Sequence, residues 1–171
     1  MIIIVFGLAA SGKTYIGKVI SKYFDFYHED ADQWLTKDMK QFVNEKKIFT
    51  LGMLENLTSN IIANIERLKS QHDNIVISQA LYREKNRDTI EKHFSPQEIM
   101  FLEVEADDDV IYQRLVKRGD WVMPDYASSM RQFFQTMITA KKINNNQFGE
   151  ESILGQLRDI VEIKDLAKKV T

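Results

Sequence analysis

The chain has 171 residues, of which 44% are hydrophobic and 28% are charged. These proportions are typical of a globular protein and argue against a disordered or membrane-embedded chain. Its 23 lysine and arginine residues are balanced by 25 aspartate and glutamate residues, so no overall positive charge favours nucleic acid. The absence of cysteine excludes disulfides, thiolate metal sites and cysteine nucleophiles.

The length is that of one ordinary domain, and we expect residues 1–171 to form it. The apolar run at the N-terminus is too short for a signal peptide or a membrane-spanning helix. We therefore expect a cytoplasmic protein, monomeric or homodimeric, with no nucleic-acid or membrane partner.

The first recognisable unit is a strand, a glycine-containing loop and a helix. Residues 2–6 are β-branched and apolar, which predicts a buried strand, and residues 15–24 carry apolar side chains at helical spacing. Between these two segments the sequence reads Gly7-Leu8-Ala9-Ala10-Ser11-Gly12-Lys13-Thr14. This run matches the phosphate-binding pattern G-x-x-x-x-G-K-[ST] in the context that the pattern requires. The alternative is a simple glycine turn between a core strand and a surface helix, and the flanking strand and helix favour the phosphate-binding loop over it.

The chemistry of this loop follows from its residue types. Gly7 and Gly12 allow the backbone to curl so that its N–H groups converge at a helix N-terminus, where an anion is favoured. Lys13 can reach the β- and γ-phosphates, and the Thr14 hydroxyl can join the coordination sphere of Mg²⁺. The sequence therefore predicts that the chain binds a nucleoside triphosphate, ATP, together with Mg²⁺.

A second strand is predicted at residues 26–28, and it ends near Asp30 and Asp32. In an open α/β sheet, ligands bind at the carboxyl ends of the strands, so both acids are candidates for the site. The alternative is that one of the two caps the following helix. Helices are then predicted over residues 33–47 and, with clearer periodicity, 51–70.

The remaining elements continue the alternation. Strands are predicted at 75–78 and 99–104, and a helix at 85–93 separates them. A further helix begins after Asp107, and Arg114 and Arg118 lie one turn apart on it. A loop at 119–125 precedes a helix at 126–140, and residues 144–146 form another loop. The last strand is placed at 160–163 and a closing helix at 166–170. Strands alternating with helices predict a parallel sheet that is covered on both faces.

Three segments resemble the small P-loop kinases, the group that holds gluconate, shikimate and nucleoside monophosphate kinases. A motif of the gluconate kinases is similar to Ala80-Leu81 followed by Arg83 and Arg87-Asp88. Their lid segment is similar to residues 114–124. Asp30-Ala31-Asp32-Gln33 is similar to shikimate kinases. The resemblance covers most of residues 1–142. It implies a three-layer P-loop NTPase α/β fold with a five-stranded parallel sheet, an acceptor region at about 30–70 and a lid at about 118–126.

The sequence departs from the gluconate kinases on the acceptor side. Leu35-Thr36 stands in place of their His-Pro, and residues 48–53 lack their acids and arginine. Asp120 replaces the histidine of the lid, and Tyr82 replaces the lysine after Ala-Leu. The resemblance therefore supports nucleotide binding more strongly than it supports gluconate as the substrate.

The resemblance also implies roles for the arginines. Arg118 would close on the transferring phosphoryl group together with Lys13, and Arg114 would stack on adenine; the alternative for both is a solvated helix face. Arg83 and Arg87 would bind an anionic acceptor, and their alternative is a polar surface.

The two aspartates receive different roles. Asp32 would orient and deprotonate the acceptor hydroxyl, and Asp30 would bind Mg²⁺ through water.

The leading hypothesis is thus an ATP-dependent kinase that phosphorylates a hydroxyl of a small-molecule acceptor, a sugar acid or related metabolite. Shikimate kinase and nucleoside monophosphate kinase activities are the alternatives, and the latter would use Arg83, Arg87 and Arg131 for the acceptor phosphate. A third reading is a nucleotide-binding or partner-binding protein that lacks transfer activity.

Overall fold

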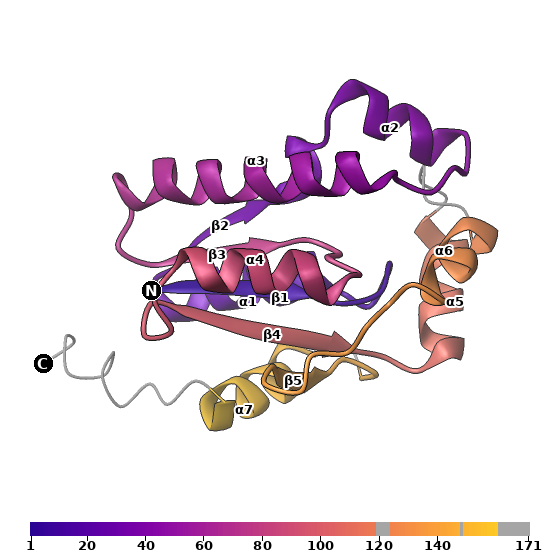
Figure 1. Cartoon of the computed structure of the whole chain (residues 1–171). Helices are drawn as coiled ribbons and strands as arrows, with labels where there is room; N and C mark the ends of the chain where they lie inside the picture. The colour runs from indigo at the N-terminus through magenta and orange to yellow at the C-terminus, as the bar shows by residue number, and fades with distance from the viewer. Residues whose placement is uncertain (119–123, 148, 161–171) are drawn as a thin grey trace, which may run out of the picture.

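A five-stranded parallel sheet forms the centre of the molecule, in the order β2-β3-β1-β4-β5 (Figure 1). The computed structural model describes residues 1–118, 124–147 and 149–160. The strands are β1 (Ile2–Phe6), β2 (Tyr27–Asp30), β3 (Ile75–Ser78), β4 (Ile99–Glu105) and β5 (Lys141–Asn144). The predicted α/β class and the parallel sheet are confirmed.

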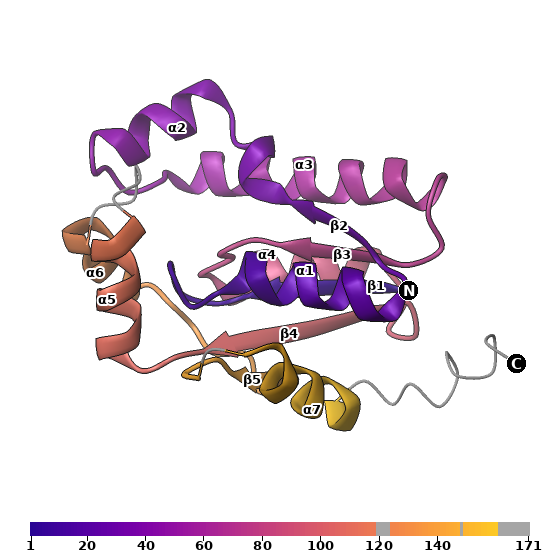
Figure 2. The ribbon, with the colours of Figure 1, turned by 180° about the vertical axis from the view of Figure 1, so that it is seen from behind.

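Helices cover both faces of this sheet. They are α1 (Lys13–Phe24), the 3-10 helix η1 (Ala31–Trp34), α2 (Lys37–Asn44), α3 (Leu51–Lys69), α4 (Glu84–His93), α5 (Asp108–Arg118), α6 (Pro124–Arg131) and α7 (Glu150–Ile160). Helices α3 and α4 lie on the face seen in Figure 1, and α1 and α7 lie on the face seen in Figure 2. In the part of the chain that the structure describes, no helix is long and apolar enough to span a bilayer.

The central strand β1 explains this layering. Successive side chains of a strand point to opposite faces, and all five side chains of β1 are buried. Ile2, Ile4 and Phe6 belong to the cluster that contains the apolar faces of α3 and α4. Ile3 and Val5 belong to the cluster that contains α1 and α7. A continuous apolar run is what a strand buried on both faces requires.

The fifth strand differs from the prediction. It lies at Lys141–Asn144 beside β4, whereas Ile160, where a strand was predicted to begin, is the last residue of α7. Only Ile143 of this edge strand is buried, so the segment lacks the apolar run by which the other strands are recognised. Residues 161–171, which include the rest of the predicted strand and the predicted closing helix, lie outside the described residues.

The helix predicted at 126–140 is also shorter than expected. Helix α6 ends at Arg131, and the chain then runs back across the sheet to β5 (Figure 1). Tertiary contacts hold this return segment: Gln135 N–H donates to Tyr82 O at 2.9 Å, and Gln135 Oε1 accepts from Glu84 N–H at 2.9 Å. These bonds replace the helical bonds that the periodicity suggested.

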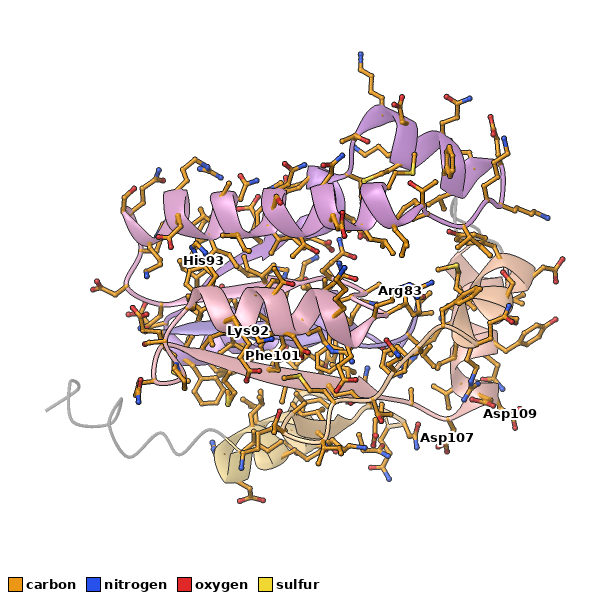
Figure 3. All side chains as sticks on the ribbon, viewed as in Figure 1. Arg83, Lys92, His93, Phe101, Asp107 and Asp109 are labelled. Atoms are coloured by element: carbon orange, nitrogen blue, oxygen red, sulfur yellow. The ribbon has the colours of Figure 1, made fainter. Side chains whose placement is uncertain are left out.

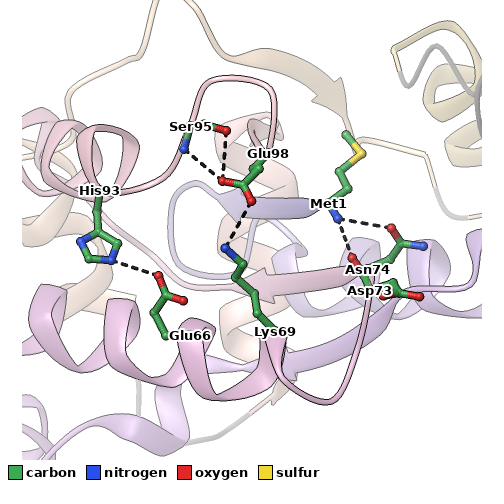
Figure 4. A network of polar contacts seen from close by, with 8 residues as sticks. All are labelled: Met1, Glu66, Lys69, Asp73, Asn74, His93, Ser95 and Glu98. Carbon is green, nitrogen blue, oxygen red and sulfur yellow. Dashed lines mark hydrogen bonds and ion pairs between the residues drawn. The ribbon is translucent and has the colours of Figure 1, made fainter.

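A polar network closes the end of the sheet where β1 begins (Figure 4). The Met1 ammonium donates to Asp73 O at 2.6 Å, and Lys69 forms an ion pair with Glu98 at 3.3 Å. Exposed ion pairs of this kind contribute only about 0–1 kcal/mol each. The network therefore ties chain segments together at the end of β1 opposite the phosphate loop, and it leaves the carboxyl edge of the sheet for the site.

One carboxylate is buried inside the sheet. Glu103 of β4 is only 2% exposed, and burial raises the pKa of its carboxyl above the ordinary value of 4.5. The Met137 N–H, at 3.5 Å from Oε2, and the charges of Lys142 and Arg87 oppose this shift without cancelling it. The folded state therefore holds the Glu103 proton more tightly than the unfolded state does.

This burial predicts a pH dependence of stability. Because the pKa of Glu103 is raised on folding, its contribution to stability is fully present below about pH 4.5 and is lost as pH rises through the folded-state pKa. Glu103→Gln, which keeps the shape without the charge, should be more stable than the wild type at pH 8, and the difference should shrink toward pH 4. Urea unfolding at both pH values measures this. An equal difference at both would show that ionisation of Glu103 is not involved.

Candidate active site

The phosphate loop lies between the carboxyl end of β1 and the first residue of α1, Lys13. Gly12 has φ 107°, in the left-handed region that favours glycine, and a Cβ at this position would collide with Asn145 Nδ2. The loop is therefore shaped by its glycine and by a side chain from a distant part of the chain.

Two residues hold the loop from outside. Ser11 O accepts a hydrogen bond from Asn145 Nδ2 at 2.7 Å and another from Arg114 Nη1 at 3.0 Å. Arg114 Nη2 also donates to Asn145 O at 2.6 Å. Arg114, predicted to stack on adenine, thus binds the backbone of the phosphate loop through the edge of its guanidinium group. Asn145 follows β5 in the segment 144–146, which was predicted only to be a loop.

Lys13 and Thr14 begin α1 and have polar partners near the loop. Lys13 Nζ donates to Leu8 O at 2.8 Å, and the Thr14 hydroxyl donates to Asp30 Oδ2 at 2.7 Å. The hydroxyl and carboxylate oxygens, side by side, are hard ligands of the kind that Mg²⁺ prefers. The described residues contain no group of three or more His, Cys, Asp or Glu side chains placed to hold a metal ion. The remaining ligands would therefore be water and phosphate oxygens, as is usual for Mg²⁺ at nucleotide sites.

The two acids at the end of β2 have different surroundings. Asp30 Oδ1 accepts from Asp32 N–H at 3.1 Å, so Asp30 is the N-cap of η1. The Asp32 side chain is exposed and lines the cavity beside the phosphate loop. The capping role that the sequence left open for either acid is therefore filled by Asp30.

A cavity of about 940 Å³ opens at the carboxyl edge of the sheet. The phosphate loop, the ends of β2 and β3, and helices α2 to α6 line it, together with the segment after β5. Lys13, Thr14, Asp30 and Asp32 all face this space. The topology thus brings the nucleotide-binding motif and the acid pair to one cavity, as expected for an open parallel sheet.

The family assignment rests on a sequence model described as an AAA domain, which matches residues 3–128. The chain belongs to this AAA domain family. No curated protein matches the sequence of this AAA domain.

Solved structures share its fold. An unliganded sugar kinase from Janibacter sp. HTCC2649 is 16% identical with a TM-score of 0.81, and the match covers 95% of this chain and 94% of that one. A gluconokinase from Sinorhizobium meliloti 1021 is 18% identical with a TM-score of 0.77, covering 99% and 97%. Shikimate kinase from Acinetobacter baumannii in complex with shikimate is 15% identical with a TM-score of 0.63, covering 95% and 94%. The resemblance to the small P-loop kinase group is confirmed at the level of the fold.

The lid predicted at about 118–126 lies mostly outside the described residues, because 119–123 are not described and Pro124 already begins α6. Arg118 is the last residue of α5, and its side chain also falls outside the described part. Its predicted contact with the transferring group stays a prediction.

The two arginines predicted to bind the acceptor occupy different places in the AAA domain. Arg83 lines the cavity, and it lies at the start of α4 on the side that carries α5 and α6 (Figure 3). Arg87 is fully buried and packs over the Phe6 ring, with its guanidinium 4.7 Å from the ring centroid. Its Nη1 donates to Leu81 O and its Nη2 to Gln135 O. A fully buried guanidinium cannot contact an acceptor directly. The prediction that Arg87 binds the acceptor is therefore corrected: its role is structural.

If Arg87 is structural, replacing it should lower the free energy of unfolding. Arg87→Met keeps the aliphatic stem but leaves the two backbone carbonyls unpaired, which should cost about 2–4 kcal/mol of unfolding free energy. Arg83→Met is the matched control, because Arg83 is half-buried at the cavity and has its guanidinium over Phe133 at 5.6 Å. Urea unfolding of both variants measures the difference. Equal stabilities would restore Arg87 as a candidate for binding.

Tyr82 occupies the position where the gluconate kinases carry lysine. Its hydroxyl accepts from Ala9 N–H of the phosphate loop at 3.3 Å, and its ring meets Phe134 edge-on at 5.9 Å. Burial raises the pKa of Tyr82 to about 12, so the hydroxyl is neutral at physiological pH. A neutral group therefore supports the loop here, where a lysine would add a positive charge.

Proposed function

We propose that this AAA domain is an ATP-dependent phosphotransferase that moves the γ-phosphoryl group to a hydroxyl of a small molecule. The observation that carries the proposal is the single cavity onto which the phosphate loop, the Thr14–Asp30 pair and the Asp32 carboxylate open. A cavity of about 940 Å³ is large enough for a nucleotide and a second small substrate.

The nucleotide side is assigned as follows. The amides of residues 7–14 and the Lys13 ammonium bind the phosphates, with Arg118 as a further cation on the transferring group. The bonds of Arg114 to Ser11 O and Asn145 O use its N–H edge, which keeps the planar faces of the guanidinium suited to stacking on adenine. Thr14, and Asp30 through water, would hold Mg²⁺, which neutralises phosphate charge when bound.

Asp32 is assigned to the acceptor hydroxyl. It lines the cavity beside the phosphate loop, and the N-cap of η1 is Asp30. A carboxylate within hydrogen-bond reach can orient the hydroxyl and accept its proton as the oxygen attacks phosphorus. Alignment and charge neutralisation, rather than covalent catalysis, would then account for most of the rate.

The arginines bear on the choice of acceptor. A nucleoside monophosphate kinase would use Arg83, Arg87 and Arg131, yet Arg87 is buried and Arg131 is paired with Asp108 on the surface. Arg83 is the one of these three that lines the cavity. This favours an acceptor with fewer negative charges than a nucleoside monophosphate.

Release of ADP tests the proposal. The protein is incubated with Mg-ATP and one of several compounds: gluconate, other sugar acids, shikimate, nucleosides and nucleoside monophosphates. We expect a hydroxyl compound to stimulate ADP release, and mass spectrometry should find one added phosphate on it. Binding of Mg-ATP with no stimulation by any compound would favour the nucleotide-binding protein without transfer activity.

A further inference from the structure

The acceptor side of the cavity has mainly apolar walls. We call this part the acceptor lobe. It consists of the lining residues that fall within three segments of the chain: 32–58, 78–86 and 126–133. Its apolar lining includes Leu35, Val43, Phe49, Leu57, Met130 and Phe133. Aromatic and aliphatic side chains that line a pocket favour a ligand with an apolar body.

Several polar groups of the lobe are already engaged with protein atoms. Asn86 Nδ2 donates to Thr58 Oγ1 at 2.7 Å and to Leu54 O at 3.2 Å. The Tyr126 hydroxyl donates to Lys47 O at 3.2 Å. A ligand with hydroxyl groups on every carbon would place many of them against apolar walls, where each unpaired group costs free energy.

Gln79 lines the lobe and has a buried donor that its protein neighbours leave unused. It is 4% exposed, and its Oε1 accepts from Ala80 N–H at 2.5 Å, which fixes the orientation of the amide. Its Nε2 has no hydrogen-bond partner among the described residues. Its backbone N–H donates to Val5 O at 3.0 Å, so Gln79 sits beside the strand that leads into the phosphate loop. A buried donor in this position is suited to an oxygen of the bound substrates.

Charge in the lobe is limited. Among the described residues that line it, the charged side chains are Asp32 and Arg83. With Asp32 facing the hydroxyl, Arg83 is the cation that can meet a negative group of the acceptor. The lobe therefore matches one anionic group at most.

We propose that the acceptor is a hydroxyl compound with an apolar ring as its body and at most one anionic group, and not a polyhydroxylated acid. The ring lies against the apolar walls, the anionic group meets Arg83, and Gln79 Nε2 donates to the hydroxyl oxygen. This inference rests on the proposed phosphotransferase function. In the reaction the hydroxyl oxygen forms a bond to the γ-phosphorus as the bond to the β,γ-bridging oxygen breaks; ADP leaves and Asp32 takes the hydroxyl proton.

The test compares two sets of compounds. Mandelate, 4-hydroxyphenyllactate and thymidine carry a ring, whereas gluconate and glycerate are small hydroxy acids without one. Thermal shift with the β,γ-imido analogue of ATP present measures binding, and ADP release with Mg-ATP measures transfer. We expect at least one ring compound to stabilise the protein and to stimulate release at least tenfold more than gluconate or glycerate does.

Two isoleucines provide a matched pair of variants. Ile48 lines the lobe and is 45% exposed, whereas Ile138 is 98% exposed and is not among the residues that line the cavity. Ile48→Asn should weaken binding of the ring compound about tenfold by removing apolar contact, and Ile138→Asn should leave it unchanged.

A third variant tests the polar contact. Gln79→Met keeps the length of the side chain but removes the donor. It should lower kcat/KM for the same compound and leave the thermal shift with Mg-ATP unchanged.

Each outcome decides a different question. Suppose that Mg-ATP stabilises the protein, but that only gluconate or glycerate gives a response, or that no compound of either set does. That result overturns this inference and leaves nucleotide binding intact. Equal effects of Ile48→Asn and Ile138→Asn overturn the placement of the ring. Failure of Mg-ATP to stabilise the wild type overturns the proposed function itself.

Discussion

Replacing Lys13 with alanine should lower phosphoryl transfer by about 10²–10³-fold and remove most of the affinity for Mg-ATP. The ammonium group is the cation of the phosphate loop, and its loss leaves the β- and γ-phosphates without a charge partner at the start of α1. Removal of one such stabilising group typically costs about 10²–10³-fold in turnover. Lys13 is only partly buried, so we expect the variant to fold.

Thermal shift separates binding from folding in this variant. A ligand at about 100 times its Kd stabilises a protein by about 2.7 kcal/mol, which for a chain of this length raises Tm by roughly 5–10 °C. The wild type and the Lys18→Ala control, which removes an exposed lysine from the same helix, should both show this rise. Lys13→Ala should show almost none. An equal rise in all three proteins would contradict the assignment of the phosphate loop.

Turnover should fall by about 10²–10⁴-fold in Asp32→Asn, with the affinity for ATP nearly unchanged. Asparagine keeps the shape and hydrogen-bonding capacity of the side chain but cannot accept the proton of the acceptor hydroxyl. The structure sharpens this prediction because Asp30 is the residue that caps η1. A loss of activity in Asp32→Asn therefore could not be ascribed to a lost helix cap.

Steady-state kinetics with the acceptor identified by the ADP-release panel measures this effect. Asp38→Asn is a suitable control, since Asp38 is also exposed and lies in the first turn of the neighbouring helix α2. Wild-type turnover in Asp32→Asn would mean that the carboxylate is not the base, and the acceptor hydroxyl would then have to be placed nearer Arg83.

The parts of the molecule that the sequence predicted well are those determined by nearby residues. Strand β1, the phosphate loop and α1 follow one another within 24 residues, and each has a strong pattern of its own. The same holds for β3 and β4, whose apolar runs are buried on both faces. Strand β5 escaped prediction because it lies at the edge of the sheet, where Ile143 alone of its four residues is buried.

The site was harder to predict where residues of the same type have different surroundings. Asp30 and Asp32 look equivalent in the sequence, and only the backbone geometry makes one of them a cap. Arg83 and Arg87 form part of one motif, yet the return segment after α6 buries Arg87 and leaves Arg83 at the cavity. Asn145 carries no local signal at all, because its partner Ser11 is 134 residues away.

That last distance has a consequence for how the protein is made. The ribosome synthesises the chain from its N-terminus. The complete motif, residues 7–14, therefore emerges long before Asn145, whose side chain donates to Ser11 O. During synthesis this contact cannot form until residue 145 has emerged, and closing so long a loop costs entropy that other contacts must offset. Affinity for nucleotide should therefore arise near the end of folding, and a nascent chain stalled before residue 145 should contain the whole motif without binding ATP as the finished protein does.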